Sequence, residues 1–299
     1  MPPSPVSRKP LVVVIAGVTA SGKSAHALNH AQQHNGVVIN ADSQQVYAGI
    51  PIVTAQPTLQ EQQLVAHRLY GYMPPTRALS AGAWREHAVT AIEETLAAGK
   101  VPIITGGTGL YLKTLMQGLS PIPDVPPEYR QAATKMLEEE GREAFYGYLA
   151  TIDPAAAARL KVGDTQRLIR AVEVFLATGK SLSFWQAQPA TPAPYHFQTT
   201  VLLPDRALLY ERINARFNQM IAAGAVAEVE ALLAQNIPAT LPAMKAVGVP
   251  ELAGYIRGEW MLEAAITQAQ QASRNYAKRQ YTWFRNQGEF TQNNNTEPC

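Results

Sequence analysis

Short apolar runs recur along the chain, and they predict the strands of a sheet buried on both faces. Such runs, rich in β-branched residues and free of polar alternation, are typical of parallel strands. They cover residues 11–17, 37–41, 101–105 and 197–203. Helical periodicity marks the segments between them, for example residues 23–33 and 80–98. The alternation of strands and helices predicts an α/β fold with a parallel sheet.

The pattern changes between residues 119 and 196, where helical segments follow one another without a strand. The proline-rich stretches PIPDVPPE and AQPATPAP lie near its two ends, and this composition is typical of linkers. The expected helices cover residues 128–140, 142–150, 154–160 and 164–177. We therefore predict a helical insertion domain within the α/β core.

The predicted organisation has five successive parts. They are a flexible N-terminus (1–10), the first part of the core (11–118), the helical insertion (119–196), the core continuation with C-terminal helices (197–288) and a disordered tail (289–299). In the core continuation, Asp205 opens an amphipathic helix whose apolar face carries Leu209, Ile213, Phe217 and Met220.

Composition narrows the class of protein. With 46% hydrophobic and 16% charged residues among 299, the chain can bury a substantial core, which excludes a disordered scaffold. Because the net charge is only +2, any binding of nucleic acid must depend on local clusters of Lys and Arg. The single cysteine, Cys299, excludes an internal disulfide and a cysteine-based zinc site. No apolar run approaches the roughly 20 residues that span a membrane, so we expect a cytoplasmic protein.

The strongest motif is GVTASGKS at residues 17–24, which satisfies G-x-x-x-x-G-K-[ST] between a predicted strand and a predicted helix. In such a P-loop, main-chain N–H groups and the helix start converge on phosphate oxygens. Lys23 would bridge phosphates, and the Ser24 hydroxyl would be a ligand for Mg²⁺. The expected diphosphate-binding residues are Gly17, Thr19, Ala20, Ser21, Gly22, Lys23 and Ser24.

Two further strand ends carry candidate chemistry. The second strand ends in NADSQQVY, which places Asp42 at the carboxyl end of a strand that we expect to neighbour the P-loop strand. Asp42 is a candidate base or metal ligand, and the alternative is a turn former before the next helix. A third strand ends in GGTGLY at residues 106–111, where Thr108 presents a hydroxyl. This strand lacks the usual acidic residue of a Walker B motif, which disfavours NTP hydrolysis.

Two groups of arginines are candidates for binding phosphate. In QRLIR at residues 166–170, Arg167 and Arg170 project together from one helix. In the last predicted helix, Arg274, Lys278, Tyr281 and Arg285 recur along one face. A polynucleotide backbone would suit both groups, and an ordinary solvated helix face is the alternative for each.

Together these motifs resemble the bacterial tRNA dimethylallyltransferases, also called tRNA isopentenyltransferases. The motifs that carry the resemblance are GVTASGKS (17–24), ADSQQVY (41–47), TAQP (54–57), GGTGLY (106–111), DTQRLIRAVEV (164–174), LPAMKAVG (241–248) and AKRQYTWFR (277–285). They follow the family's order across residues 11–285. The chain departs from the family in two places: KAVGVP at 245–250 replaces R-x-V-G-Y-R, and PIVTAQP at 51–57 replaces D-I-G-T-A-K-P.

The resemblance implies that a dimethylallyl group passes from dimethylallyl diphosphate to N6 of the adenosine just 3′ of the anticodon, in tRNAs reading codons that begin with U. The P-loop would then hold a diphosphate and not an NTP, which agrees with the missing Walker B acid. The implied catalytic residues are Lys23, Asp42 and Thr108, with Mg²⁺ on Ser24. The implied contacts to the anticodon stem-loop of tRNA are Asp42, Ser43, Gln44, Gln45, Thr108, Arg130, Gln166, Arg167, Leu168, Ile169, Arg170, Lys278, Arg279 and Arg285. We expect a monomer.

The chemistry of this reaction suits the candidate residues. The N6 lone pair of adenine is delocalised into the ring, so a base such as Asp42 that removes the proton assists the attack. Lys23, Mg²⁺ and the P-loop amides would neutralise the departing diphosphate. The adenosine would have to leave the anticodon stack to reach them.

Three other functions remain as alternatives. A related transferase would prenylate free AMP, ADP or ATP, but the arginine groups favour a larger RNA acceptor. A small-molecule kinase would hold ATP in the P-loop and use Asp42 as the base for a hydroxyl group. A non-catalytic RNA-binding protein would not need an intact P-loop.

Overall fold

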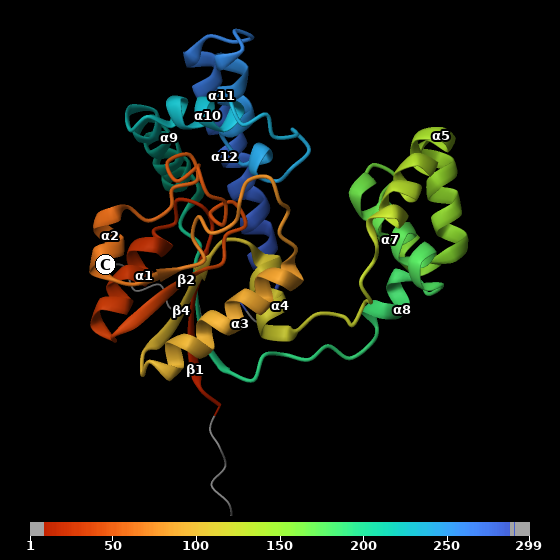
Figure 1. Ribbon diagram of the computed structural model, residues 1–299, viewed down its shortest axis with the longest axis horizontal. Coiled ribbons are helices and arrows are strands. Elements are labelled where there is room, and N and C mark those ends of the chain that lie inside the picture. The colour runs from red at the N-terminus through yellow and green to blue at the C-terminus, as the bar shows by residue number, and fades with distance from the viewer. Residues whose placement is uncertain (1–8, 288–289, 291–299) are drawn as a thin grey trace, which may run out of the picture. The chain divides into compact units, whose positions relative to one another are not determined.

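The computed structural model describes residues 9–287 and 290, and its centre is a five-stranded parallel sheet (Figure 1). The strands are β1 (Leu11–Gly17), β2 (Gly36–Asn40), β3 (His67–Arg68), β4 (Val101–Gly106) and β5 (His196–Leu202). Four of them lie within one residue of the predicted runs. The sequence pattern missed β3, because a strand of two residues is too short to show a period.

The strand order is β3-β2-β4-β1-β5, so the prediction that β2 neighbours the P-loop strand is wrong. β4 lies between them and pairs with both. The crossover helix α1 (Lys23–Gln33) packs against β1, β4 and β2. It connects β1 to β2 across the position between them that β4 later fills. A hydrophobic run predicts that a strand is buried, but it does not say which strand lies beside it.

Helices cover both faces of the sheet, which explains why β1, β2 and β4 are buried at nearly every position. Val13 and Ile15 of β1 pack with α1 on one face. Val12 and Val14 point to the other face, whose cover includes α3 (Ala81–Ala97) and α4 (Gly109–Gln117). The loops after β1, β2 and β4 consequently meet at one edge of the sheet.

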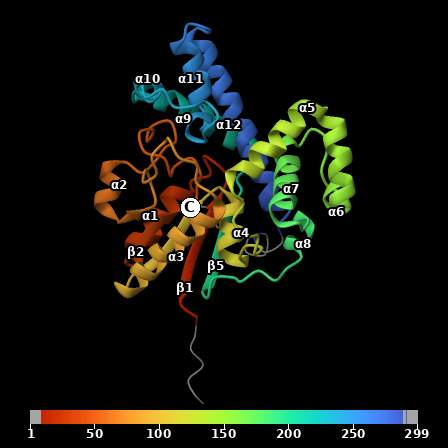
Figure 2. The same cartoon turned by 45° about the vertical axis from the view of Figure 1, so that its right-hand side comes forward.

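The C-terminal segment of the core is helical. Its helices are α9 (Arg206–Ala222), α10 (Ala225–Leu233), α11 (Val249–Ile256) and α12 (Leu262–Arg285), with a 3₁₀ turn at Ala243–Lys245. Asp205 caps α9 as predicted, since its side chain accepts a hydrogen bond from the Ala207 N–H at 2.8 Å. Figures 1 and 2 show this helical group beyond the carboxyl ends of the strands, where α2 (Leu59–Leu64) also lies near the same edge.

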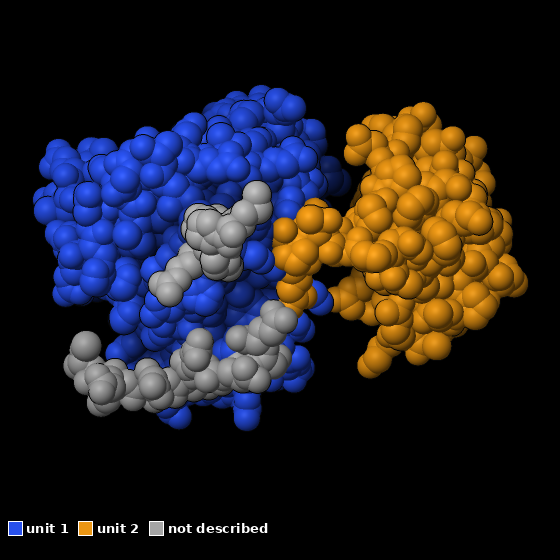
Figure 3. All heavy atoms as spheres, turned by 90° about the horizontal axis from the view of Figure 1, so that it is seen from below, with its two compact units in different colours: residues 1–116, 193–299 blue, residues 117–192 orange. Residues whose placement is uncertain are grey.

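The helical insertion forms a compact unit of its own, Gln117–Pro192, coloured separately in Figure 3. It contains α5 (Pro127–Ile152), α6 (Pro154–Ala157), α7 (Thr165–Thr178) and α8 (Leu182–Gln186), of which α8 was not predicted. A left-handed Gly141, with φ 81°, divides α5 where the sequence pattern separates two helices. Phe145, Leu149 and Leu168 are among the residues of its own apolar core.

The insertion ends earlier than the predicted boundary at 196. Residues 193–196 belong to the α/β unit, because Tyr195 packs into the main core and His196 begins β5. The main-chain N–H of His196 also donates to the carbonyl of Pro10 at 2.8 Å.

The two predicted unstructured ends are only partly within the described residues. Pro10 is in place beside β5, and Phe290 is buried against Trp283 and Phe284, so these two residues do not fit the flexible end and the disordered tail. The rest of the tail and residues 1–8 lie outside the described part of the chain. Among the described helices, none is both long and apolar enough to cross a membrane.

Candidate functional site

The predicted P-loop connects β1 to α1 and has the backbone geometry of a phosphate cradle. Gly22, with φ 90°, is left-handed and precedes the first turn of α1, and Ala20 also has a positive φ of 60°. A side chain on Gly17 would place its Cβ 2.7 Å from the carbonyl oxygen of Leu202, so only glycine fits there. The loop therefore turns its main chain toward the start of the helix, where anions bind.

Lys23 is nearly buried in this loop, with 8% of its surface exposed. Its ammonium donates to the carbonyl of Val18 at 3.2 Å. Burial lowers the pKa of Lys23 to about 8, Asp42 acts against this shift, and Arg216 adds to it. A bound polyanion would supply the charge that stabilises the protonated form.

The surroundings of the P-loop are suited to an anion. The buried hydroxyl of Ser21 has no hydrogen-bond partner within the part of the chain that the structure describes. Ser21, Lys23 and Ser24 line a pocket whose other wall is α9, with Arg212 and Arg216. Burial lowers the pKa of the Arg216 guanidinium, and Asp42 opposes that shift. Two arginines, a lysine and a helix start thus line this pocket, which suits an anion.

Asp42 directly follows β2 and is held by the buried side chain of Asn40. The Asn40 amide oxygen accepts from the Asp42 N–H at 2.8 Å, and its nitrogen donates to the carbonyls of Asp42 and Leu69, each at 3.0 Å. One carboxylate oxygen of Asp42 accepts from the Gln44 N–H at 2.9 Å. Asp42 is 7% exposed, so its carboxylate has a fixed direction in a sheltered place.

Asp42 and the P-loop line one pocket. The other predicted residues in this pocket are Thr19, Ala20, Lys23, Ser24, Gln44 and Gln45. α9 and α12 supply part of its remaining lining, including Arg216 and Tyr276. The tertiary fold therefore brings a carboxylate and an anion cradle together, although β4 lies between β1 and β2.

Thr108 reaches the same region from the loop after β4. Its hydroxyl accepts from the Ser43 N–H at 2.8 Å and donates to the Ser43 hydroxyl at 3.1 Å. The phenol of Tyr276 lies close to both of these side chains. Burial raises the pKa of Tyr276 far above its usual value, and the charge of Asp42 acts in the same direction. Tyr276 thus stays a neutral hydroxyl beside Asp42.

The two segments that depart from the family pattern are tied to the turn after Asp42. The Gln44 amide oxygen accepts from the Val247 N–H at 3.1 Å, and Gln45 donates to the carbonyls of Thr54 at 2.9 Å and Ala55 at 2.6 Å. The carboxylate of Glu228 accepts from two consecutive main-chain N–H groups, Ile52 at 2.7 Å and Val53 at 2.8 Å. The amide side chains of Gln44 and Gln45 are therefore engaged within the protein.

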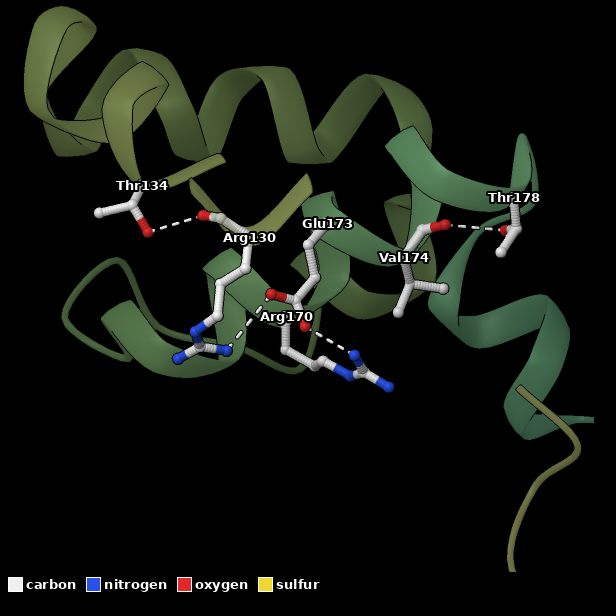
Figure 4. A network of polar contacts seen from close by, with 6 residues as sticks. All are labelled: Arg130, Thr134, Arg170, Glu173, Val174 and Thr178. Carbon is white, nitrogen blue, oxygen red and sulfur yellow. Dashed lines mark hydrogen bonds and ion pairs between the residues drawn. The ribbon is translucent and has the colours of Figure 1, made fainter. Parts of the chain in front are cut away.

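Within the insertion, two of the predicted tRNA-binding arginines converge on one buried acid (Figure 4). Glu173 is 3% exposed, and its carboxylate oxygens accept from Arg130 at 3.3 Å and from Arg170 at 2.6 Å. The arginine side chains remain 52% and 42% exposed. Each arginine uses one terminal nitrogen for Glu173. The other N–H groups of each guanidinium can donate to a phosphate.

The other predicted residues of α7 divide by exposure. Gln166 and Arg167 are exposed, and Arg167 pairs with Asp164 at 3.6 Å. Leu168 and Ile169 are buried in the core of the insertion, at 0% and 7% exposure, so we assign their side chains to packing and not to RNA contact. An α-helix has 3.6 residues per turn, so a helix that packs on one face buries some of these side chains and exposes others.

The predicted residues of α12 lie on its outer face. Lys278, Arg279 and Arg285 are exposed. Two guanidinium groups lie over the Tyr281 ring, that of Arg206 at 5.3 Å and that of Arg285 at 5.9 Å from the ring centre. Arg274, which completes the predicted basic stripe, is instead engaged with Asn214 at 2.6 Å. Within the predicted stripe, Arg274 is therefore used for a contact inside the protein, and Lys278 and Arg285 are exposed.

Sequence analysis missed Asn40, Arg216, Tyr276 and Gln280. Arg216 lies on the apolar face of α9, three residues after Ile213 and four before Met220, and Gln280 lies on the buried face of α12. A polar residue on the buried face of a predicted helix is the signal that could have identified Arg216 and Gln280.

A glycine loop that opens a helix, a buried lysine and a neighbouring carboxylate at the carboxyl edge of a parallel sheet define a P-loop enzyme with a phosphorylated substrate. The sequence profile of the family described as IPP transferase matches residues 45–287. A tRNA dimethylallyltransferase of Rhodopseudomonas palustris (strain BisB5) is 50% identical over 287 residues, which cover 95% of this chain and 89% of the relative. A relative of the same name from Rhodospirillum centenum is 49% identical over 278 residues, covering 92% of this chain and 88% of the relative.

Solved structures agree. A full-length tRNA isopentenylpyrophosphate transferase from Bacillus halodurans has a TM-score of 0.66 and 33% identity, covering 94% of this chain and 88% of the other. A eukaryotic dimethylallyltransferase, captured acting on tRNA, has a TM-score of 0.81 and 29% identity, covering 92% and 70%. The chain belongs to the IPP transferase family, and it is a transferase with a P-loop NTPase-like fold.

Proposed function

We propose that this enzyme transfers a dimethylallyl group from dimethylallyl diphosphate to N6 of the adenosine 3′-adjacent to the anticodon, in tRNAs reading codons that begin with U. The observation that carries the proposal is the single pocket that holds both the P-loop and Asp42. The names of the relatives, tRNA dimethylallyltransferase, support the same acceptor and donor group. We place the reaction in the cytoplasm and assign it to a monomer.

The P-loop side of the pocket would hold the diphosphate. The main-chain amides of residues 17–24 and the Lys23 ammonium would face the anion there. Arg216 is the arginine we assign to the diphosphate, because it lines both the P-loop pocket and the pocket of Asp42. These groups favour departure of the leaving group by neutralising its charge.

A divalent cation fits the donor chemistry of this site. Ser24 lines the pocket beside Lys23 and Asp42, and its hydroxyl is a hard oxygen ligand suited to Mg²⁺. In the described residues no three His, Cys, Asp or Glu side chains gather as a metal site, so substrate oxygens and water would supply the other ligands. When bound, Mg²⁺ neutralises charge on the diphosphate.

The carboxylate side of the pocket would hold the acceptor base. The N6 nitrogen attacks C1 of the dimethylallyl group, the C1–O bond breaks, and its electron pair leaves with the diphosphate. Asp42 accepts the proton that N6 releases as the C–N bond forms. Thr108 and Ser43 stand next to Asp42, where their hydroxyls can orient the adenine edge. A buried, fixed carboxylate suits this role because it needs no reorganisation during the reaction.

The tRNA would be held by positive and polar side chains, which both units supply. Arg130, Gln166, Arg167 and Arg170 on the insertion, and Lys278, Arg279 and Arg285 on α12, are exposed or half-exposed donors. Phosphate contacts of this kind position an RNA without reading its sequence.

One experiment distinguishes this proposal from its alternatives. Labelled dimethylallyl diphosphate is offered in turn with unmodified tRNA, with free AMP and with ATP plus small alcohols. Label in tRNA, mapped to the adenosine next to the anticodon, supports the proposal. Label in AMP would indicate an adenylate isopentenyltransferase, and ATP consumption with phosphorylation of an alcohol would indicate a kinase. Absence of all three products with intact, tRNA-binding protein would favour a non-catalytic RNA-binding protein.

A further inference from the structure

Gln280 of α12 is a buried polar side chain that contacts two loops of the site. It is 5% exposed and lies between the buried residues Ala277 and Phe284 on the inner face of the helix. A glutamine at such a position must find hydrogen-bond partners, because an unpaired buried amide is strongly unfavourable. Its two partners are main-chain groups from two different loops of the site.

The amide of Gln280 connects the P-loop to the loop after β4. Its oxygen accepts from the Thr19 N–H at 2.8 Å, and its nitrogen donates to the Gly107 carbonyl at 2.9 Å. Both ends of the amide are satisfied in one orientation only, since a flipped amide would set oxygen against oxygen and N–H against N–H. A glutamate would likewise face the Gly107 carbonyl without a donor.

Steric fit shows how closely the amide is held. A Cβ built on Gly107 would lie 2.1 Å from the Gln280 side-chain nitrogen and 3.0 Å from the carbonyl oxygen of Gly17. Any larger residue at position 107 must therefore displace the Gln280 amide. The glycine of this loop is thus explained by the side chain of a helix far along the chain.

The two loops that Gln280 joins carry the two halves of the site. Thr19 belongs to the anion cradle of Lys23. Gly107 precedes Thr108, whose hydroxyl bonds to Ser43, the neighbour of Asp42. Hydrogen bonds and main chain thus connect the P-loop, through Gln280, to the turn that carries Asp42.

We propose that Gln280 is a positioning residue that sets the separation between the diphosphate cradle and the acceptor side of the pocket. The inference rests on the proposed prenyl transfer, in which the attacking nitrogen and the allylic carbon must meet in line at about 3–3.5 Å. Gln280 touches neither reacting group. It acts by holding the two loops that do.

The first test replaces Gln280 by Met, which has similar length but no hydrogen-bonding amide, and by Glu. Thr282→Ala, on the exposed face of the same helix, is the matched control. At saturating dimethylallyl diphosphate and tRNA, we expect both Gln280 variants to lower the single-turnover rate on the order of tenfold to a hundredfold. Their tRNA dissociation constants should stay within about twofold of the native value, as should that of the control. A rate equal to that of the control would overturn the inference while prenyl transfer by the native enzyme still stood.

A second test changes Gly107, the residue on the other side of the contact with the Gln280 amide. Gly107→Ala should slow the reaction in the native background, because its Cβ collides with the Gln280 amide. In the Gln280→Ala background this collision is removed, so we expect Gly107→Ala to cause little further loss. Effects that multiply fully in the double variant would show that the two residues act separately and would refute the inference.

A third measurement does not depend on activity. Hydrogen exchange of the peptides covering residues 17–24 and 106–111 should accelerate in Gln280→Met and not in Thr282→Ala. Unchanged exchange in both peptides would overturn the positioning role. This outcome is distinct from failure of the proposed function, which would appear as a native enzyme that leaves tRNA unlabelled.

Discussion

The side chain of Asn40 holds the main chain of Asp42 on both sides of the residue. It accepts from the Asp42 N–H at 2.8 Å and donates to the Asp42 carbonyl at 3.0 Å. Asn40 is fully buried, and its own carbonyl accepts from the Trp84 indole at 3.0 Å. The direction of the Asp42 carboxylate therefore depends on a residue that lines no part of the described pocket of Asp42.

Replacement of Asn40 by Ala should weaken both folding and chemistry. It leaves the buried N–H and carbonyl of Asp42 unpaired, and we expect the free energy of unfolding in urea to fall by about 2–4 kcal/mol. The single-turnover rate should fall as well, since Asp42 is released. Asn29→Ala, on the exposed face of α1, is the control and should change neither quantity. Native-like urea stability in the Asn40 variant would contradict this account.

Replacement of Asp42 by Asn should remove the base and preserve the shape of the site. We expect the chemical rate to fall on the order of a hundredfold or more, with tRNA affinity nearly intact. Rapid-quench single turnover and filter binding measure the two quantities. An unchanged single-turnover rate would exclude Asp42 as the base.

Replacement of Arg216 by Gln should weaken diphosphate binding. The loss of a charged, largely buried hydrogen-bond donor corresponds to roughly 1.5–3 kcal/mol, or about 10- to 150-fold in affinity. Inhibition by inorganic diphosphate measures this directly. Arg212→Gln, from the same helix but exposed, should have a clearly smaller effect. Equal effects of the two variants would argue against the assignment of Arg216.

Diphosphate binding should depend on pH through Lys23. Its pKa of about 8 means that the free enzyme carries the ammonium below this value and loses it above. Because the bound anion requires the charged form, affinity should be level below pH 8 and then fall by roughly tenfold per pH unit. Calorimetric titration with dimethylallyl diphosphate measures this profile. In Lys23→Arg the break near pH 8 should disappear, and its persistence would assign it to another group.

Replacement of Arg170 by Gln should weaken tRNA binding without changing the chemical step. Loss of one phosphate contact reduces the dependence of log K on log salt by about one unit. Arg142→Gln is the control, since Arg142 is an exposed arginine of the same unit outside the Glu173 network. Fluorescence anisotropy at several salt concentrations measures the slope. A slope equal to that of the native protein would remove Arg170 from the phosphate contacts.

Much of the fold and part of the site could be predicted from local sequence. The runs at β1, β2, β4 and β5 marked strands, of which β1, β2 and β4 are buried along nearly their whole length, and the Gly141 break separated two helices where predicted. The strand order was not predictable, because a hydrophobic run does not specify which strand pairs with it. The strand β3 was not predictable, because two residues are too few to show a period.

The sequence by itself determined the anion cradle and named Asp42, since a P-loop is a short contiguous segment whose glycines and lysine act through their own main chain. Only the tertiary structure showed that Asn40 orients Asp42, that Arg216 faces the P-loop, and that Gln280 joins two loops. The reason is physical. Gln280 is 261 residues from Thr19 and 173 from Gly107, and a hydrogen bond over such a separation exists only once the sheet and α12 have packed together.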